Sequence, residues 1–283
     1  MNKPGFDDLN NKIVVITGGA GVIGTSIAIG LGWLGMKTVI LDIDPEAAGK
    51  TAETVQKTTG SLSFGIPANV LDKQSLQSAK EVINKTIGKI DFLINGAGGN
   101  SPKATTQVEE ILPTGLGHLE ATFYGLEMEG FQRVFDLNFM GTLLPTMVFT
   151  DDMLAGKKGA VLNISSLNSF RPLTKIPAYS AAKAAVNNFT EWLAVHLAKT
   201  GIRVNAISPG FFLTNQNRFL LIDEETGKLK PRGEKIINNT PMGRFGEPDE
   251  LLGAVAYLLS DCSRFVTGTV LLVDGGFNAY SGV

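Results

Sequence analysis

The first forty residues alternate between a strand pattern and a helical pattern. Residues 12–17, KIVVIT, form a short run of mostly β-branched side chains, and residues 38–41, TVIL, form a second run. Between them, residues 18–24 are rich in glycine, and residues 25–34 place apolar side chains at helical spacing. A strand, a tight turn, a helix and a second strand in this order predict a right-handed βαβ unit.

The same alternation continues to the end of the chain. Further apolar runs predict strands at residues 63–66, 90–94, 160–164, 202–207 and 270–273, with helices at 73–87, 130–150, 177–200 and 249–259. Most of the strand runs are apolar throughout, which is typical of strands covered on both faces. The predicted fold class is therefore α/β: a doubly wound parallel sheet of about seven strands, a Rossmann fold, in a single domain spanning residues 1–283.

Two stretches lack a clear pattern, near residues 100–129 and 211–239. Both follow predicted carboxyl ends of strands, where ligands bind in sheets of this kind. We interpret the two stretches as substrate loops or lids. The alternative interpretation is that they are surface insertions.

Composition narrows the possible functions. Hydrophobic residues make up 43% of the 283 residues, and 25 basic against 27 acidic residues leave no basic excess, so nucleic acid is not an expected partner. Cys262 is the one cysteine, which excludes an internal disulfide and a cysteine-rich metal cage. The acids near His118 lack the spacing of metal ligands, so we expect no metal. A polar N-terminus and the lack of a membrane-spanning apolar run predict a cytoplasmic protein without a membrane partner.

The glycine-rich turn after the first strand predicts a dinucleotide site. Gly18, Gly21 and Gly24 let the backbone approach a pyrophosphate, and the N-terminus of the following helix attracts its negative charge. Asp42 ends the second strand, where a carboxylate accepts both ribose hydroxyls of the adenosine and repels the extra phosphate of NADP. No Arg or Lys follows it directly, so we predict NAD, as NADH or NAD⁺, in preference to NADP. The alternatives are an ordinary βα turn for the glycines and a helix N-cap for Asp42.

Ser166, Tyr179 and Lys183 form the predicted catalytic group. Tyr179 and Lys183 lie four positions apart and therefore on one face of a helix. Reduction of a carbonyl needs a proton donor beside the oxygen, and we expect a neighbouring ammonium to lower the tyrosine pKa from its ordinary value of about 10. Ser166, at the end of the predicted strand 160–164, can hold the substrate oxygen and stabilise its developing charge.

In this order and spacing, the motifs resemble the short-chain dehydrogenase/reductase family, from Lys12 to Gly276. The resemblance implies hydride transfer between a nicotinamide cofactor and a small hydroxyl or carbonyl substrate, with Tyr179 as general acid/base, and a homo-oligomer (dimer or tetramer). It adds Asn138 to the catalytic group. The cofactor-binding residues that it implies are Gly18, Gly21, Val22, Ile23, Gly24, Asp42, Asn69, Val70, Asn95, Ala97, Gly98, Tyr179, Lys183, Pro209, Gly210, Phe212 and Thr214.

The glycine turn departs from the pattern of most short members of that family. They place the middle glycine one position later, where this chain has Val22. The spacing with Gly21 resembles the extended branch, whereas the rest of the chain matches the short branch.

A narrower resemblance concerns the substrate. Segments such as SPGFFLTNQNR and TPMGRFGEP resemble the short-chain type of D-mannonate oxidoreductase, also called fructuronate reductase. This resemblance implies reversible reduction of D-fructuronate to D-mannonate with NADH. A sugar acid needs a cationic anchor and hydroxyl partners, for which Asn168, Arg171 and Asn217 are the candidates. The alternatives are the same mechanism on another sugar acid, a polyol or a 3-oxoacyl thioester, or a dinucleotide-sensing protein without turnover.

Overall fold

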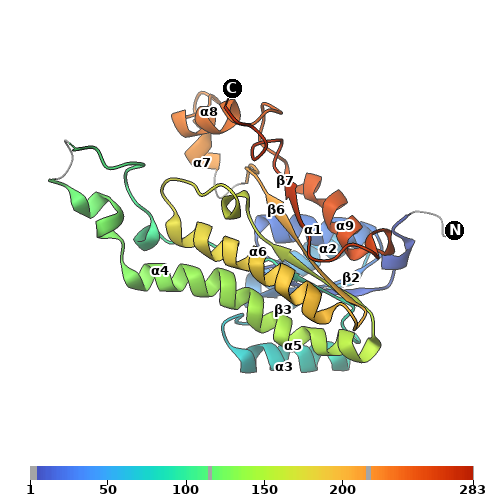
Figure 1. Ribbon diagram of the computed structural model, residues 1–283. Helices are drawn as coiled ribbons and strands as arrows, with labels where there is room; N and C mark the ends of the chain where they lie inside the picture. The colour runs from blue at the N-terminus through green and yellow to red at the C-terminus, as the bar shows by residue number, and fades with distance from the viewer. Residues whose placement is uncertain (1–4, 114–116, 215–217, 283) are drawn as a thin grey trace.

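A seven-stranded parallel sheet forms the centre of the molecule (Figure 1). The computed structural model describes residues 5–113, 117–214 and 218–282. Across the sheet the strands follow the order β3-β2-β1-β4-β5-β6-β7. Their bounds are β1 Ile13–Thr17, β2 Lys37–Asp42, β3 Ser63–Pro67, β4 Phe92–Asn95, β5 Gly159–Ile164, β6 Ile202–Pro209 and β7 Val270–Val273. The doubly wound α/β fold predicted from the sequence is confirmed.

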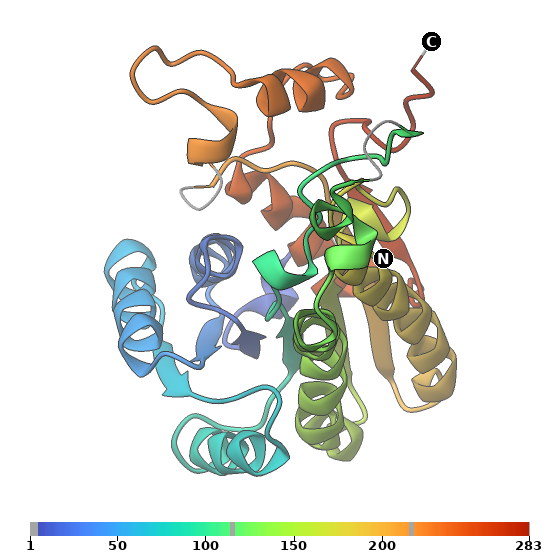
Figure 2. The ribbon, with the colours of Figure 1, turned by 90° about the vertical axis from the view of Figure 1, so that its left-hand side faces the viewer.

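Helices cover both faces of the sheet (Figure 2). The helices of one face are α1 (Val22–Trp33), α2 (Pro45–Thr59) and α9 (Leu252–Leu259). Those of the other face are α3 (Lys73–Thr86), α5 (Gly141–Gly156) and α6 (Pro177–Leu197). Within the described ranges, no helix combines the length and the apolar character that crossing a membrane requires.

Successive side chains of each inner strand enter two different cores. In β1, Val14 and Ile16 pack with the helices of the first face, whereas Ile13 and Val15 pack with those of the second. This alternation follows from strand geometry, in which neighbouring side chains point to opposite faces. Because both faces are buried, most positions of the inner strands are apolar, as the sequence pattern indicated.

The helices differ from the sequence-based expectation in two main places. The pattern predicts no element at α2, because the buried face of this helix carries small or polar residues, Ala48, Thr51 and Ala52, with Val55 as its one larger apolar side chain. The helix expected at residues 130–150 is three consecutive segments: α4 (Met128–Phe135), the π-helix η6 (Asp136–Met140) and α5. The remaining helical elements are η1 (Asp7–Leu9), η2 (Pro102–Ala104), η4 (Leu119–Ala121), η5 (Phe123–Gly125), η7 (Leu167–Ser169), α7 (Arg218–Leu221), α8 (Pro231–Asn238), η8 (Pro248–Leu251) and η9 (Asp261–Ser263).

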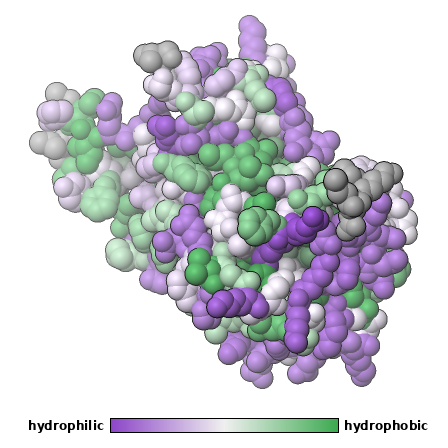
Figure 3. All heavy atoms as spheres, turned by 45° about the vertical axis from the view of Figure 1, so that its right-hand side comes forward, coloured by the Kyte–Doolittle hydropathy of each residue, from purple (hydrophilic) through white to green (hydrophobic). Residues whose placement is uncertain are grey.

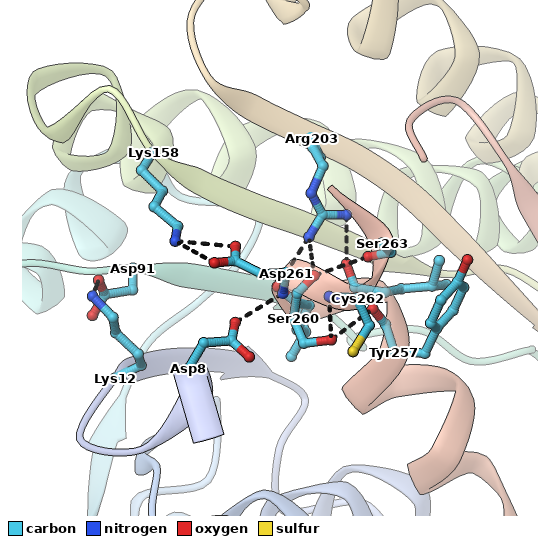
Figure 4. A network of polar contacts seen from close by, with 12 residues as sticks. Asp8, Lys12, Asp91, Lys158, Arg203, Tyr257, Ser260, Asp261, Cys262 and Ser263 are labelled. Atoms are coloured by element: carbon cyan, nitrogen blue, oxygen red, sulfur yellow. Dashed lines mark hydrogen bonds and ion pairs between the residues drawn. The ribbon is translucent and has the colours of Figure 1, made fainter. Parts of the chain in front are cut away.

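A hydrogen-bond network closes the amino-terminal edge of the sheet (Figure 4). Arg203, at the start of β6, donates to the carbonyls of Leu259 and Ser260 at 3.0 and 3.1 Å. These carbonyls lie at the end of α9, where a helix leaves its last acceptors without intrahelical partners. Asp261 joins the network through a 3.0 Å ion pair with Lys158. This edge of the sheet is therefore tied together structurally, and the opposite edge carries the cavity described below.

Residues 100–113 and 117–129 project from the body as a lobe (Figure 1). Figure 3 shows apolar side chains gathered on this lobe, and Leu112, Phe123 and Tyr124 are among the exposed hydrophobic residues. The lobe is anchored where Lys175, before α6, donates to the Gln107 carbonyl at 2.7 Å.

Candidate active site

A cavity of about 680 Å³ opens at the carboxyl edge of the sheet. It lies where β1 and β4 are neighbours and the strand order changes direction, which is the usual ligand position in doubly wound sheets. The sequence-predicted residues that line it are Gly18, Gly21, Val22, Ile23, Gly24, Asp42, Asn69, Val70, Ala97, Gly98, Ser166, Tyr179, Lys183, Pro209, Gly210, Phe212 and Thr214.

The glycine turn after β1 packs directly against the loop after β4. Gly18 has a φ of +61°, and a Cβ atom there would lie 2.7 Å from the Ala97 Cα. Thr17 holds the two loops together, because its Oγ1 accepts the N–H groups of Gly96 and Ala97 at 3.1 and 3.3 Å. Any side chain at position 18 would therefore push the loops apart.

The N-terminus of α1 faces the cavity without a side-chain cap. Gly21 is the N-cap residue, and the first turn carries no acidic side chain. Val22 and Ile23 line the cavity, and the first N–H groups of a helix have no intrahelical acceptor. These donors, together with the positive end of the helix dipole, fit the diphosphate of a dinucleotide.

Asp42 ends β2 and also lines the cavity. Its carboxylate accepts the N–H of Ala20 at 3.2 Å and that of Asp44 at 3.3 Å. The N-cap of α2 is Asp44, which accepts from the first turn of that helix. Asp42 is therefore not the helix cap, and its side chain lies between the glycine turn and the start of α2.

Ser166 and Tyr179 meet at the part of the cavity formed by β5 and α6. Ser166 follows β5, and Tyr179 lies in the first turn of α6. Burial raises the pKa of Tyr179 above its ordinary value of 10.0, and a hydrogen bond with Ser166 offsets part of this effect. The expectation of a lowered tyrosine pKa is therefore wrong for the chain alone, because desolvation outweighs the stabilisation of tyrosinate.

Lys183 lies one helical turn after Tyr179, with 4% of its surface exposed. Its Nζ donates to the carbonyl of Ile164 at 2.7 Å and lies 5.7 Å from the centroid of the Tyr179 ring. Burial disfavours the ammonium form and lowers the pKa of Lys183 from 10.5 to about 8. At pH 7 the ammonium form still predominates, so a positive charge lies beside the tyrosine.

Asn138 sits in the π-helix between α4 and α5 and is fully buried. Its side-chain amide donates to the carbonyls of Gly99 and Val134, both at 2.7 Å. A Cβ atom at Gly98 would lie 2.6 Å from Asn138 Oδ1 and 3.3 Å from Lys183 Nζ. Asn138 is therefore adjacent to the lysine amine, and π-helical turns are frequent at functional sites.

Comparison with known proteins agrees with this geometry. A family model described as enoyl-(acyl carrier protein) reductase matches residues 18–278. An uncharacterized oxidoreductase of Haemophilus influenzae is 50% identical over 285 residues, which cover 100% of this chain and 99% of the relative. The chain belongs to the short-chain dehydrogenase/reductase family.

Two further proteins are similar over nearly their whole lengths. A 5-keto-D-gluconate 5-reductase of Escherichia coli strain K12 is 35% identical, over 95% of this chain and 96% of that protein. A Haemophilus influenza crystal structure with bound NAD, provisionally assigned as a D-mannonate oxidoreductase, has a TM-score of 0.90 at 48% identity and covers 98% of this chain and 99% of its own. The chain is thus a nicotinamide-dinucleotide-dependent oxidoreductase that acts on alcohol groups.

One residue predicted to bind the cofactor lies elsewhere in this short-chain dehydrogenase/reductase. Asn95 is buried and does not line the cavity. Its side-chain amide donates to Thr146 Oγ1 at 2.9 Å and to Asn163 Oδ1 at 2.8 Å. Because neighbouring side chains of a strand point to opposite faces, Asn95 faces α5 and ties that helix to β4 and β5. These contacts give Asn95 a structural role between the strands and α5, and a contact of its side chain with the cofactor stays a prediction.

Two of the three predicted substrate residues, Asn168 and Arg171, do not line the cavity. Asn168 is buried in η7. Arg171 is exposed, and its guanidinium donates to Asn278 Oδ1 at 3.2 Å and to the Asn278 carbonyl at 2.9 Å. Asn217 lies outside the described residues. Arg171 thus fastens the C-terminal segment, which replaces its expected role as the cationic anchor of a substrate.

Arg133 and Leu137 are among the lining residues that the sequence prediction did not name. Arg133 and Leu137 line the cavity from α4 and η6. They lie four positions apart, one helical turn, and Leu137 directly precedes the predicted Asn138. Neither residue lies three or four positions from Asn138, so helical spacing from that asparagine could not have marked them.

Proposed function

We propose that this short-chain dehydrogenase/reductase catalyses the reversible reduction of D-fructuronate to D-mannonate with NADH, with Tyr179 as general acid/base. The observation that supports the mechanism is the cavity itself. Ser166, Tyr179 and Lys183 line the same cavity as the uncapped N-terminus of α1 and Asp42. Carbonyl reduction by a dinucleotide needs hydroxyl groups and an amine next to the site that holds the diphosphate. Ser166, Tyr179 and Lys183 supply these groups, and the N-terminus of α1 is the diphosphate site.

The side chains of this site would handle the proton. When bound, the cofactor supplies or accepts the hydride. The Tyr179 hydroxyl donates its proton to the substrate oxygen during reduction and takes one back during oxidation. Ser166 holds the same oxygen by a hydrogen bond and stabilises its developing charge. The Lys183 ammonium, 5.7 Å from the ring, stabilises the tyrosinate left behind, and Asn138 beside it extends the proton path.

NAD is the preferred cofactor in this proposal. The carboxylate of Asp42 would accept the ribose hydroxyls of the adenosine and repel a phosphate in their place. The next residues, Ile43 and Asp44, offer no positive charge to compensate. The same argument counts against a 3-oxoacyl thioester reductase, for which we expect NADPH.

A sugar acid is the preferred substrate. This choice is supported by the Haemophilus influenza protein whose crystal structure contains NAD. That protein is provisionally assigned as a D-mannonate oxidoreductase and is 48% identical to this chain. The second candidate is a 5-keto sugar acid, which the E. coli relative at 35% identity favours. The two substrates share a carboxylate and a ketone on a six-carbon chain.

We also propose that the chain forms a homo-oligomer through α5 and α6. These helices expose Met147, Trp192 and Val195, with 57%, 58% and 80% of their surfaces accessible. Large exposed apolar side chains on neighbouring elements are typical of protein–protein interfaces. Analytical ultracentrifugation tests the proposal, and a sedimentation coefficient of a monomer at micromolar concentration would contradict it.

A substrate panel tests the proposed function. Hexuronates, other keto sugar acids, neutral ketoses and acetoacetyl thioesters are each assayed with NADH and with NADPH. We expect D-fructuronate with NADH to give the highest kcat/KM. Tyr179→Phe should abolish turnover and leave NADH binding intact, because it deletes the proton donor and little else. Activity confined to thioesters, or normal turnover by the phenylalanine variant, would refute the proposal.

A further inference from the structure

Arg133 is a cation on the cavity wall that the catalytic scheme leaves unused. The charged side chains that line the cavity, among the described residues, are Asp42, Arg133 and Lys183. Lys183 is buried and its Nζ donates to the Ile164 carbonyl. Arg133 is exposed at the surface of α4. It is thus the positive side chain of the cavity that an entering ligand can reach from solvent.

The neighbours of Arg133 leave its charge uncompensated. Glu129, one turn earlier, pairs with Lys103 at 3.4 Å, and Asp136, three positions later, accepts from Gln132 at 2.7 Å. In the part of the chain that the structure describes, the Arg133 guanidinium itself makes no ion pair and no side-chain hydrogen bond. A planar guanidinium with its donors unused is suited to bidentate binding of a carboxylate.

Packing places Arg133 near the reacting end of the cavity. Val134, the next residue, is buried in a small cluster with Ala178, and Tyr179 packs against this cluster. The helix that carries Arg133 contacts α6 and η2, whereas α1 packs with α2 and α9. Arg133 therefore lies on the wall of the cavity formed by α4 and α6, which carries Tyr179. The N-terminus of α1, which fits the diphosphate, lies on the opposite wall.

We propose that Arg133 binds the carboxylate of the substrate and thereby selects keto sugar acids over neutral ketoses. The inference rests on the proposed function and adds the recognition of the acid group to it. It also explains how the site can hold an anionic substrate although Arg171 is engaged by the C-terminal segment. Because the guanidinium lies at the cavity mouth, the carboxylate remains partly hydrated and the pairing is sensitive to salt.

The test compares Arg133→Met with Arg133→Lys and with Arg264→Met, a control that removes an exposed arginine of the η9 turn. For each protein we measure kcat/KM for D-fructuronate and for D-fructose, a neutral ketose of equal length, and the Kd of NADH. Arg133→Met should lose about 10- to 100-fold in kcat/KM for the acid, mainly through KM, as expected for a charge-assisted hydrogen bond. D-Fructose and the Kd of NADH should change less than about twofold. Arg133→Lys should recover part of the loss, and Arg264→Met should match the wild type.

The salt dependence of KM separates charge recognition from a structural effect. Added salt should raise the wild-type KM for D-fructuronate, and this slope should be flatter in Arg133→Met. An unchanged kcat/KM for the acid would overturn the proposal. So would equal losses for acid and neutral substrates, or a weakened Kd of NADH, which would place Arg133 on a cofactor phosphate.

The wild type itself distinguishes failure of this inference from failure of the proposed function. If the wild type reduces D-fructuronate and Arg133→Met does so equally well, the inference alone fails. If the wild type prefers another keto sugar acid, the proposed substrate fails and the same variants are compared on that acid. A wild type that reduces only neutral substrates overturns both.

Discussion

The variant Lys183→Met tests how the buried amine of Lys183 affects the stability of the fold, separately from its role beside Tyr179. Lys183 is 4% exposed, and burial lowers its pKa from 10.5 to about 8. The folded protein therefore binds this proton more weakly than the unfolded chain does. At about 1.4 kcal/mol per pH unit, the difference corresponds to about 3 kcal/mol of lost stability wherever both states are protonated.

The pH dependence of this penalty has a definite sign. Because the folded pKa is the lower one, the penalty is fully present below about pH 8 and disappears as the pH rises towards 10.5. Through this group the wild type should gain about 2.5 kcal/mol between pH 7 and pH 10. Lys183→Met lacks the titration, so its free energy of unfolding should miss this gain.

Urea unfolding without cofactor, followed by far-ultraviolet circular dichroism at several pH values, measures the effect. The slope of the unfolding free energy with pH is more decisive than its value at pH 7. The methionine variant also leaves the buried Ile164 carbonyl without its hydrogen bond from Lys183, which costs roughly 1–3 kcal/mol at every pH. Lys85→Met, which removes an exposed lysine of α3, is the control and should run parallel to the wild type. If the curves of wild type and Lys183→Met are also parallel, the desolvation argument for Lys183 is wrong.

Two further substitutions test the cofactor end of the cavity. Asp42→Ala should lower the ratio of kcat/KM for NADH over NADPH by at least about tenfold, because it removes a charge that repels the extra phosphate; an unchanged ratio would exclude Asp42 as the ribose acceptor. Gly18→Ala should destabilise the fold by about 2 kcal/mol and weaken NADH binding, since φ is +61° and the new Cβ would meet the Ala97 backbone. Gly49→Ala, where a Cβ meets nothing within 4 Å on α2, should instead stabilise by about 0.5–1 kcal/mol, and equal responses at both glycines would contradict the steric reasoning.

The elements that the sequence predicts well are those with strong apolar runs. All seven strands match their predicted positions to within two residues, and the inner strands were readable because strands buried on both faces are mostly apolar. α2 was missed for the opposite reason: Ala48, Ala52 and Thr51 on its buried face are too small or too polar to form a readable stripe. A better signal was Asp44 before Pro45, which marks a helix start.

The motifs correctly located the site residues that lie at strand ends and tight turns. Gly18, Ser166 and Tyr179 line the cavity as predicted, although their roles in catalysis and binding remain predictions. Arg171 and Asn95 do not line the cavity. Their positions in the sequence do not show in which direction a loop or strand side chain points. The direction of Arg171 is set by Asn278, more than a hundred residues away along the chain. Long-range partners of this kind have no local signature.

The raised pKa of Tyr179 and the lowered pKa of Lys183 share one physical cause. Both groups are buried where α6 packs against β5. Lys183 Nζ and Asn138 Oδ1 lie so close to the Gly98 backbone that a Cβ atom at Gly98 would have no room. Close packing excludes water, and loss of water disfavours tyrosinate and ammonium alike. The tyrosine is therefore kept as a proton donor, which suits carbonyl reduction, and the lysine remains charged near neutrality. Alcohol oxidation needs the deprotonated tyrosine, so its rate should rise with pH more steeply than that of reduction.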